Sequence, residues 1–265
     1  MLEKKRIYLI PNRGEWSESE ALRKEYNASY EYNDFYMAAV LDDQRLQEEI
    51  IEEYAKRRTD FSEDTIHGAF LDVTLHSTDP CIREISEKRV RQSMDIAKRM
   101  GARGVVFHTN RIYGFREETY LKNWEITNET FFRKLAEEYP EQEILIENMF
   151  DESYDVLLGF AQKLSDVPNI GICLDYAHAA AFGKYPEEWL AQLAPFVKHM
   201  HLNDNDLKED MHLPVGEGAI DWKRFDDTYH AAGAEATALI EVKGAKKQRA
   251  SLEYMKQNGI YIRKS

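Results

Sequence analysis

The sequence predicts an α/β protein built as a single (β/α)₈ TIM barrel. Eight short runs rich in Val, Ile and Leu recur along its 265 residues, and helical segments lie between the later ones. Ionisable side chains stand at the ends of several runs. Short buried strands that alternate with helices indicate a parallel sheet covered by helices, and eight such units in about 250 residues fit a barrel.

A doubly wound open sheet is the alternative arrangement of the same elements. The sequence has no Gly-x-Gly-x-x-Gly motif after its first apolar run, which disfavours a dinucleotide-binding sheet. It also has no low-complexity segment and no obvious linker. We therefore expect residues 1–265 to form one domain.

The predicted strands begin with RIYLI and end with ATALI, and their residues are 6–10, 29–33, 66–71, 104–107, 143–146, 170–174, 197–202 and 236–240. Apolar residues at helical spacing predict the helices at 43–57, 83–100, 118–138, 153–165, 187–194, 221–232 and 247–257. Helix 83–100 has its apolar side at Ile85, Val90, Met94, Ile96, Ala97 and Met100. Gly101 ends this helix, and we expect a polar loop at 109–117.

Composition limits the classes of function. The net charge of −13 disfavours a broad nucleic-acid surface, although it leaves room for a local basic groove. Cys81 and Cys173 are far apart, so we expect reduced thiols, with Cys173 in the core. No apolar run approaches membrane-spanning length, and the N-terminal stretch reads as a strand instead of a signal peptide, so a cytoplasmic protein is expected.

The ionisable side chains at strand ends are the most informative feature of the chain. In a TIM barrel all these ends point to one face, where active sites lie. Ligand-type residues stand within or just after six different predicted strands, at His67, His108, Glu147, Asp175, His201 and Glu241. Three more follow in adjacent loops, at His178, Asp210 and His212.

A metal ion explains this combination better than separate structural roles. One histidine in a strand is usually a hydrogen-bonded core residue, and we assign that role to His76, His199 and His230. Several carboxylates buried together are costly without a cation. Mixed imidazole and carboxylate ligands suit Mn²⁺, Zn²⁺, Co²⁺ or Fe²⁺, which can polarise a carbonyl or activate water.

Several motifs at these positions resemble the xylose-isomerase-like TIM-barrel superfamily. They are LIENM at 145–149, ICLDYAH at 172–178, HLNDND at 201–206, HLPVGEGAIDW at 212–222 and LIEVKG at 239–244. The resemblance covers about residues 66–244. The superfamily includes sugar-phosphate isomerases and epimerases, ketose 3-epimerases and endonuclease IV-type AP endonucleases, so the resemblance is specific for the fold and less so for the reaction.

Comparison with the epimerases implies a site with one divalent ion, Mn²⁺, Zn²⁺, Co²⁺ or Mg²⁺. Its ligands would be Glu147, Asp175, His201 and Glu241. Glu147 and Glu241 would also be the catalytic pair that moves a proton through an enediolate. The expected substrate is a sugar, sugar phosphate or polyol, contacted by His67, His108, His178 and His212. Members are often homo-oligomers. His212 departs from the arginine that several epimerases carry at this position.

Comparison with the endonucleases implies a different use of the same residues. All nine positions match the ligands of a site with three zinc ions, so His67, His108, His178, Asp210 and His212 would form additional metal sites. The chain departs from the fuller endonuclease motifs in three places. Thr109-Asn110 stands for Pro-Gly, Met149-Phe150 follows Glu147-Asn148 where that family continues with Thr-Ala-Gly, and Met211 replaces an arginine.

We therefore favour a metal-dependent sugar isomerase or epimerase. The alternative is an AP endonuclease or another metal-dependent phosphoesterase with two or three zinc ions. A related lyase or dehydratase and a non-catalytic binding barrel are further possibilities. One bound ion favours isomerisation, whereas two or three favour phosphoester hydrolysis. Residues 32–36 could add an aromatic wall beside the site.

Overall fold

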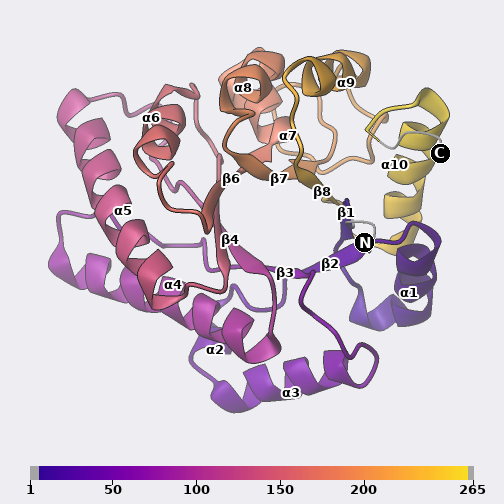
Figure 1. Cartoon of the computed structure of the whole chain (residues 1–265), viewed down its shortest axis with the longest axis horizontal. Helices are drawn as coiled ribbons and strands as arrows, with labels where there is room; N and C mark the ends of the chain where they lie inside the picture. Colours follow the sequence, from indigo (N-terminus) through magenta and orange to yellow (C-terminus); the bar gives the residue numbers. More distant parts are fainter. Residues whose placement is uncertain (1–5, 262–265) are drawn as a thin grey trace. The chain divides into compact units, whose positions relative to one another are not determined.

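Eight parallel strands form a closed barrel in the computed structural model, which describes residues 6–261. The strands pair in chain order from β1 to β8, and β8 returns to pair with β1 (Figure 1). They are β1 (Ile7–Leu9), β2 (Ser29–Tyr32), β3 (Thr65–His67), β4 (Gly104–His108), β5 (Glu143–Glu147), β6 (Ile170–Asp175), β7 (Val197–Leu202) and β8 (Thr237–Ile240). The predicted (β/α)₈ fold is confirmed.

Helices connect successive strands, and most lie within two residues of their predicted positions. They are α1 (Trp16–Glu25), α2 (Ala38–Leu41), α3 (Gln44–Ala55), α4 (Pro80–Met100), α5 (Glu118–Glu138), α6 (Asp155–Lys163), α7 (Tyr176–His178), α8 (Pro186–Leu193), α9 (Trp222–Ala231) and α10 (Ala245–Asn258). A 3₁₀ turn (Arg13–Glu15) precedes α1, and a π-helix (Ala179–Gly183) follows α7. None of the helices among residues 6–261 is long and apolar enough to span a membrane.

The chain divides into two compact units. The first unit comprises the residues up to Tyr30, residues 148–158 and the residues from Ile172 onward. In it, β6, β7 and β8 pair in a register that sets Asp175 beside His201, and His201 beside Leu239. Helices α8, α9 and α10 lie on the outer side of these strands (Figure 1). Side chains of α9 seal this layer, since Trp222 and Phe225 are almost fully buried.

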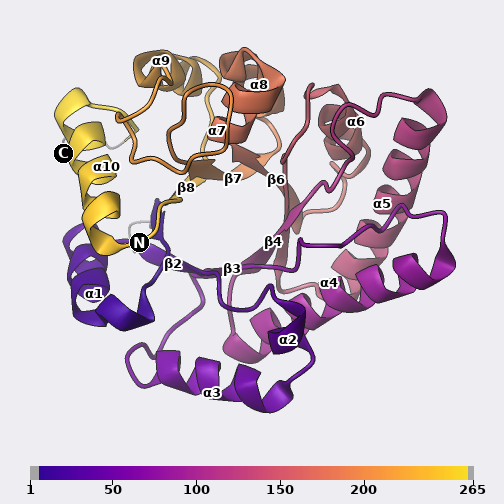
Figure 2. The same ribbon diagram turned by 180° about the vertical axis from the view of Figure 1, so that it is seen from behind.

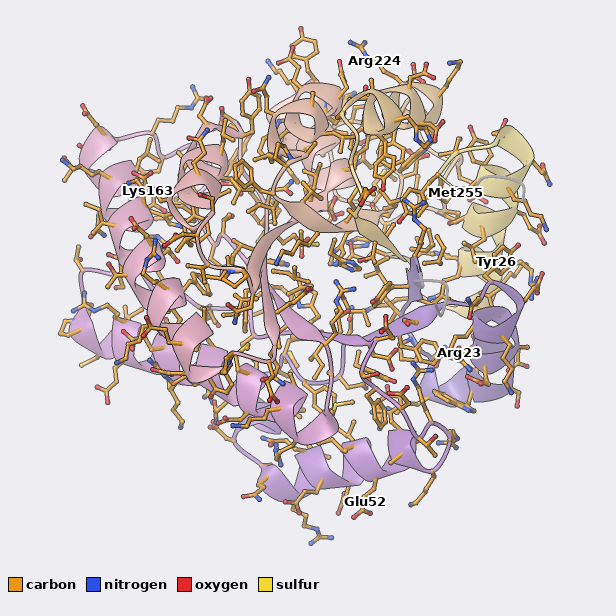
Figure 3. All side chains as sticks on the ribbon, viewed as in Figure 1. Arg23, Tyr26, Glu52, Lys163, Arg224 and Met255 are labelled. Atoms are coloured by element: carbon orange, nitrogen blue, oxygen red, sulfur yellow. The ribbon has the colours of Figure 1, made fainter. Side chains whose placement is uncertain are left out.

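The second unit comprises residues 31–147 and 159–171. Its strands β3, β4 and β5 pair so that His67 lies beside Val106, and His108 lies beside Glu147. Helices α3, α4 and α5 lie on their outer side, as Figure 2 shows from behind. The charged side of α3 faces solvent, and Glu52 points away from the strands (Figure 3). Parallel register therefore brings the ends of neighbouring strands, and their ionisable residues, to the same edge.

Three details differ from the predictions. The third strand ends at His67, because after it only Gly68 keeps a ladder hydrogen bond, and Leu71 is 52% exposed. Ile85 is 40% exposed, although it was assigned to the apolar side of its helix. The loop at 109–117 is less polar than predicted, since Ile112 and Tyr113 are 59% and 60% exposed.

Candidate metal centre

A compact group of two imidazoles and one carboxylate lies at the ends of β3, β4 and β5 in the second unit. The Nε2 atoms of His67 and His108 are 3.1 Å apart. Oε2 of Glu147 is 3.2 Å from Nε2 of His108 and 3.7 Å from Nε2 of His67. His67 is 4% exposed and Glu147 is 0% exposed. Two nitrogens and one oxygen thus converge in a buried place.

The orientation of His67 fits a metal ligand. Its Nδ1 lies 3.1 Å from the carbonyl oxygen of Gly68. A carbonyl only accepts, so Nδ1 carries the proton and the lone pair of the neutral ring is on Nε2, which faces His108 and Glu147. Ligating histidines typically donate their second nitrogen in this way. The donor set of two imidazoles and a carboxylate suits Zn²⁺ or Mn²⁺.

Aromatic rings border the same histidines. The Phe70 ring lies 4.6 Å from the His108 ring and 5.1 Å from the His67 ring, between ring centroids. The Tyr36 ring lies 5.0 Å from Phe70 and 6.4 Å from His67. Of residues 32–36, Tyr36 is therefore the one that borders the site, while Phe35 is fully buried in the core.

A second group lies in the first unit at the ends of β6, β7 and β8. One ligand atom from each of Asp175, His201 and Glu241 lies within 4.8 Å of the other two. Nδ1 of His201 is 3.5 Å from Oε2 of Glu241. Asp175 and His201 are 0% exposed and Glu241 is 7% exposed. Three of the four ligands in the predicted single-metal set therefore lie together within the first unit, and the fourth, Glu147, is the last residue of β5 in the second unit.

A third group consists of His178, Asp210 and His212, also in the first unit. Oδ2 of Asp210 is 3.1 Å from Nε2 of His212 and 3.4 Å from Nε2 of His178. The Nδ1 atoms of the two rings point away from Asp210. That of His178 lies 2.9 Å from the carbonyl of Asn148, and that of His212 lies 2.9 Å from the carbonyl of Glu241. Both rings thus repeat the orientation of His67.

Protonation in the metal-free protein follows from these contacts. Burial alone disfavours the charged forms of both partners. The hydrogen bond from Nε2 to Asp210, together with the charge of Glu241, nevertheless raises the pKa of His212 to about 10. Hydrogen bonds with His178 and His212 hold the pKa of Asp210 well below its usual range despite burial. At neutral pH, His212 is therefore an imidazolium beside a carboxylate.

Metal binding to this group is expected to expel that proton. The pKa of His212 in the folded protein exceeds its ordinary value of 6.5, so protonated His212 stabilises the metal-free protein. This contribution to the unfolding free energy is complete below pH 6.5 and is lost as the pH rises toward about 10. The affinity of the group for Co²⁺ should therefore rise about tenfold per pH unit in this window. Calorimetry in buffers of different ionisation enthalpy measures the protons released when Co²⁺ binds. The His212→Asn variant should release about one proton fewer than the wild type. Equal proton release by the variant and the wild type would contradict this assignment.

The loop that carries Asp210 and His212 is fixed by a buried carboxylate, that of Asp204, which is 0% exposed. It accepts hydrogen bonds from the backbone amides of Asn205, Gly216 and Ile220 and from Nε1 of Trp222, at 2.7–3.2 Å. The backbones of Asp204 and Leu213 also pair antiparallel. Asp204 thus connects the segment before Asp210 with the segment after His212 by hydrogen bonds.

Two glycines make room for this arrangement. A Cβ atom at Gly218 would overlap with Oδ1 of Asp204. Gly216 has a φ of +90°, a conformation that side chains rarely adopt, and a Cβ there would overlap with the ring of Tyr254. The Gly216-Glu217-Gly218 motif therefore serves close packing around Asp204.

Asp204→Asn should loosen this loop. Each carboxylate oxygen accepts from two of the four donors, so the amide nitrogen would face two N–H groups, which costs about 3 kcal/mol of unfolding free energy in a buried, charge-assisted network. We expect urea unfolding to report this loss and zinc binding at the His178, Asp210 and His212 group to weaken. Asp206→Asn is the matched control, because Asp206 is exposed and accepts hydrogen bonds from the backbone amides of Lys208 and Glu209 on the same loop. Equal effects of both substitutions would refute the role of Asp204.

Sequence reasoning missed the residues that support the ligands. Asn148 donates from Nδ2 to the carbonyl of Asp175 and accepts at Oδ1 from the Asp175 amide, at 2.8 and 2.9 Å. Asn203 donates to Oε2 of Glu241 at 3.3 Å. The signal in the sequence was an Asn directly after each of the strands β5 and β7. These side chains hold ligands in place without being ligands in these groups.

The histidines assigned to structural roles have ordinary partners. His76 meets the hydroxyl of Tyr120 at 3.0 Å, and burial lowers its pKa to about 4. His199 is hydrogen-bonded to Thr237, and His230 pairs with Asp226. Cys173 is buried and Cys81 is exposed, both as free thiols. The predicted core position of Cys173 is confirmed, and the structural roles of the three histidines stay predictions.

Curated relatives match part of the chain. The uncharacterized protein MJ1614 of Methanocaldococcus jannaschii is 30% identical over 165 residues, which are 61% of this chain and 63% of that protein. A probable endonuclease 4 of Persephonella marina is 25% identical over 194 residues, 64% of this chain and 66% of that protein. The matches thus span less than two thirds of either relative.

Solved structures share the fold over nearly the full length. The TTHB071 protein from Thermus thermophilus, soaked with ZnCl₂, has a TM-score of 0.74 at 23% identity and covers 94% of this chain and 96% of its own. A D-tagatose 3-epimerase-like protein has a TM-score of 0.73 at 21% identity, with 95% and 96% covered. The family model described as xylose isomerase-like TIM barrel matches residues 28–258. The chain therefore belongs to the xylose isomerase-like TIM barrel family.

Proposed function

We propose that the chain is a metal-dependent hydrolase of phosphate esters. The observation that carries the proposal is the number of candidate ligands, which supply three groups of three residues. They are His67 with His108 and Glu147, Asp175 with His201 and Glu241, and His178 with Asp210 and His212. This pattern supports two or three ions, and multinuclear sites are typical of phosphoester hydrolysis.

The group of His178, Asp210 and His212 is the main reason for preferring a hydrolase to a single-metal isomerase. In a single-metal isomerase, His178 and His212 would be expected to turn toward a sugar. Instead their Nε2 atoms both face Oδ2 of Asp210, at 3.4 and 3.1 Å, and their Nδ1 atoms are engaged by backbone carbonyls. Imidazoles turned in this way are prepared to share one cation with a carboxylate.

Glu147 is proposed to serve two groups. It ends β5, which is next to β6 in the barrel order, and it matches the fourth ligand of the Asp175 group in the resemblance. When bound, divalent ions would neutralise the phosphate and lower the pKa of a water molecule. The chain's own side chains hold the ligand geometry, and buried Asp175 and His201 limit access of bulk water.

The substrate is proposed to be a small phosphate ester instead of a long nucleic acid. The net charge is −13, and exposed Asp206 and Glu209 stand on the loop that carries Asp210. These charges repel a polyanion that extends beyond the metal ions. The similarity to a probable endonuclease 4 supports the reaction type, and the departures at Met149-Phe150 and Met211 favour a different substrate.

Sugar isomerisation or epimerisation is the second candidate. It is favoured by the deep burial of the Asp175, His201 and Glu241 group, which would complete a four-ligand site with Glu147. In that case Glu147 and Glu241 would exchange the proton of the substrate carbon. Tyr36 and Phe70 would then offer apolar rings to the sugar.

Two assays on the metal-loaded protein separate the candidates. We expect release of p-nitrophenol from p-nitrophenyl phosphate or its diester, and no deuterium incorporation into a panel of ketoses in D₂O. Deuterium incorporation without phosphoester hydrolysis would overturn the hydrolase proposal and support the isomerase.

A further inference from the structure

Apolar side chains border the His178, Asp210 and His212 group. The rings of Phe150 and Phe182 meet edge to face with centroids 5.0 Å apart. Their centroids lie 6.5 Å and 6.2 Å from that of His178. Met211, between two candidate ligands in the sequence, is 44% exposed. All these residues belong to the first unit.

The two rings are held by the same segments that position the candidate ligands. Phe150 stands two residues after Asn148, whose carbonyl accepts from His178 and whose side chain binds the Asp175 backbone. Phe182 lies in the π-helix that begins directly after His178. A π-helix often marks a functional site. The positions of the two rings are therefore set by the same backbone segments that position His178 and Asp175.

Exposure distinguishes Phe150 from a packing residue. It is 37% exposed, whereas Tyr176, Trp222 and Phe225 in the same unit are at most 2% exposed. Part of the Phe150 ring is therefore exposed to water beside polar groups. A ligand that covers this apolar surface gains free energy from its burial. Binding sites typically combine a few polar groups with such aromatic walls.

We propose that Phe150 and Phe182 form a subsite for an aromatic group of the substrate. The subsite selects esters in which the phosphate is joined to an aryl alcohol. This inference rests on the proposed phosphoester hydrolysis and names its substrate class. It also gives a use to Phe150, one of the positions at which the sequence departs from the endonuclease motifs.

The test compares two stable phosphonates that share one anionic head. Calorimetry on the zinc-loaded protein should show phenylphosphonate binding about tenfold more tightly than methylphosphonate, as expected for one aromatic contact. Phe150→Ala and Phe182→Ala should each reduce this ratio to about twofold and leave methylphosphonate affinity within about twofold. Tyr185→Asn is the control, because Tyr185 is a 64% exposed aromatic residue beyond the π-helix, and asparagine tolerates its φ of 47°. It should keep the tenfold ratio.

Equal binding of the two phosphonates, or no binding of phenylphosphonate, would overturn the subsite. An unchanged ratio in both phenylalanine variants would overturn the assignment of these residues. Failure of the proposed function is distinguishable, because a phenylphosphonate preference that depends on Phe150, without hydrolysis of any aryl phosphate, would leave the subsite intact and reject the hydrolase.

Discussion

Replacing Glu147 by glutamine is expected to lower kcat/KM by at least about 100-fold. Outer partners of metal ligands commonly contribute 10- to 100-fold, so loss of a ligand charge should cost at least as much. Glu147 is fully buried, with its Oε2 atom within 3.7 Å of His67 and His108. Both candidate reactions require this carboxylate. Steady-state kinetics on the metal-loaded variant measures the effect.

Glu143→Gln is the matched control for this variant. Glu143 begins the strand that Glu147 ends, and it pairs with Arg103 at 3.0 Å at a partly exposed position. The same change of charge at the opposite end of β5 should leave kcat/KM within about twofold, because surface pairs contribute little. Similar losses in both variants would mean that Glu147 supports the strand and not the reaction.

Replacing Arg58 by alanine is expected to destabilise the fold by about 3–5 kcal/mol, as breaking a buried ion pair does. Arg58 donates to both carboxylate oxygens of Asp64, at 2.5 and 2.6 Å, and the side chains are 9% and 0% exposed. The hydroxyl of Tyr32 also donates to Asp64. Burial and the neighbouring charge of Asp64 raise the pKa of Tyr32 far above its usual range, so it stays a donor.

Urea unfolding measures this loss, and two variants calibrate it. Arg45→Ala should change the unfolding free energy by less than about 0.5 kcal/mol, because Arg45 pairs with Glu49 across an exposed helix face. Arg58→Met combined with Asp64→Leu should recover much of the loss, since no charge is then buried alone. A small effect of Arg58→Ala would show that water reaches Asp64.

The sequence predicted the barrel because its strands and main helices carry clear periodic signals. Helix α1 was missed, since its ten residues bury only Ser19 and Leu22 and therefore show little apolar pattern. Ile85 was misassigned because the first turns of α4 are less buried than the turns that carry Val90 and Met94. Local pattern describes an element, whereas burial at its ends depends on what packs against it.

The candidate ligands were predictable because strand ends in a parallel barrel share one face. The roles of Asp204 and Phe150 were not, since each depends on contacts between distant segments. Asp204 binds groups up to residue 222, and Phe150 meets Phe182. The expectation of isomerisation rested on motif similarity, and the proposal of hydrolysis rests on the mutual orientation of His178, Asp210 and His212.

Metal stoichiometry tests the central claim most directly. Zinc-loaded protein, freed of loose metal and measured by inductively coupled plasma mass spectrometry, should contain two or three ions per chain. Asp210→Asn should contain one ion fewer, because its carboxylate belongs to the third group alone. A single ion in both proteins would contradict the multinuclear site and, with it, the proposed hydrolase.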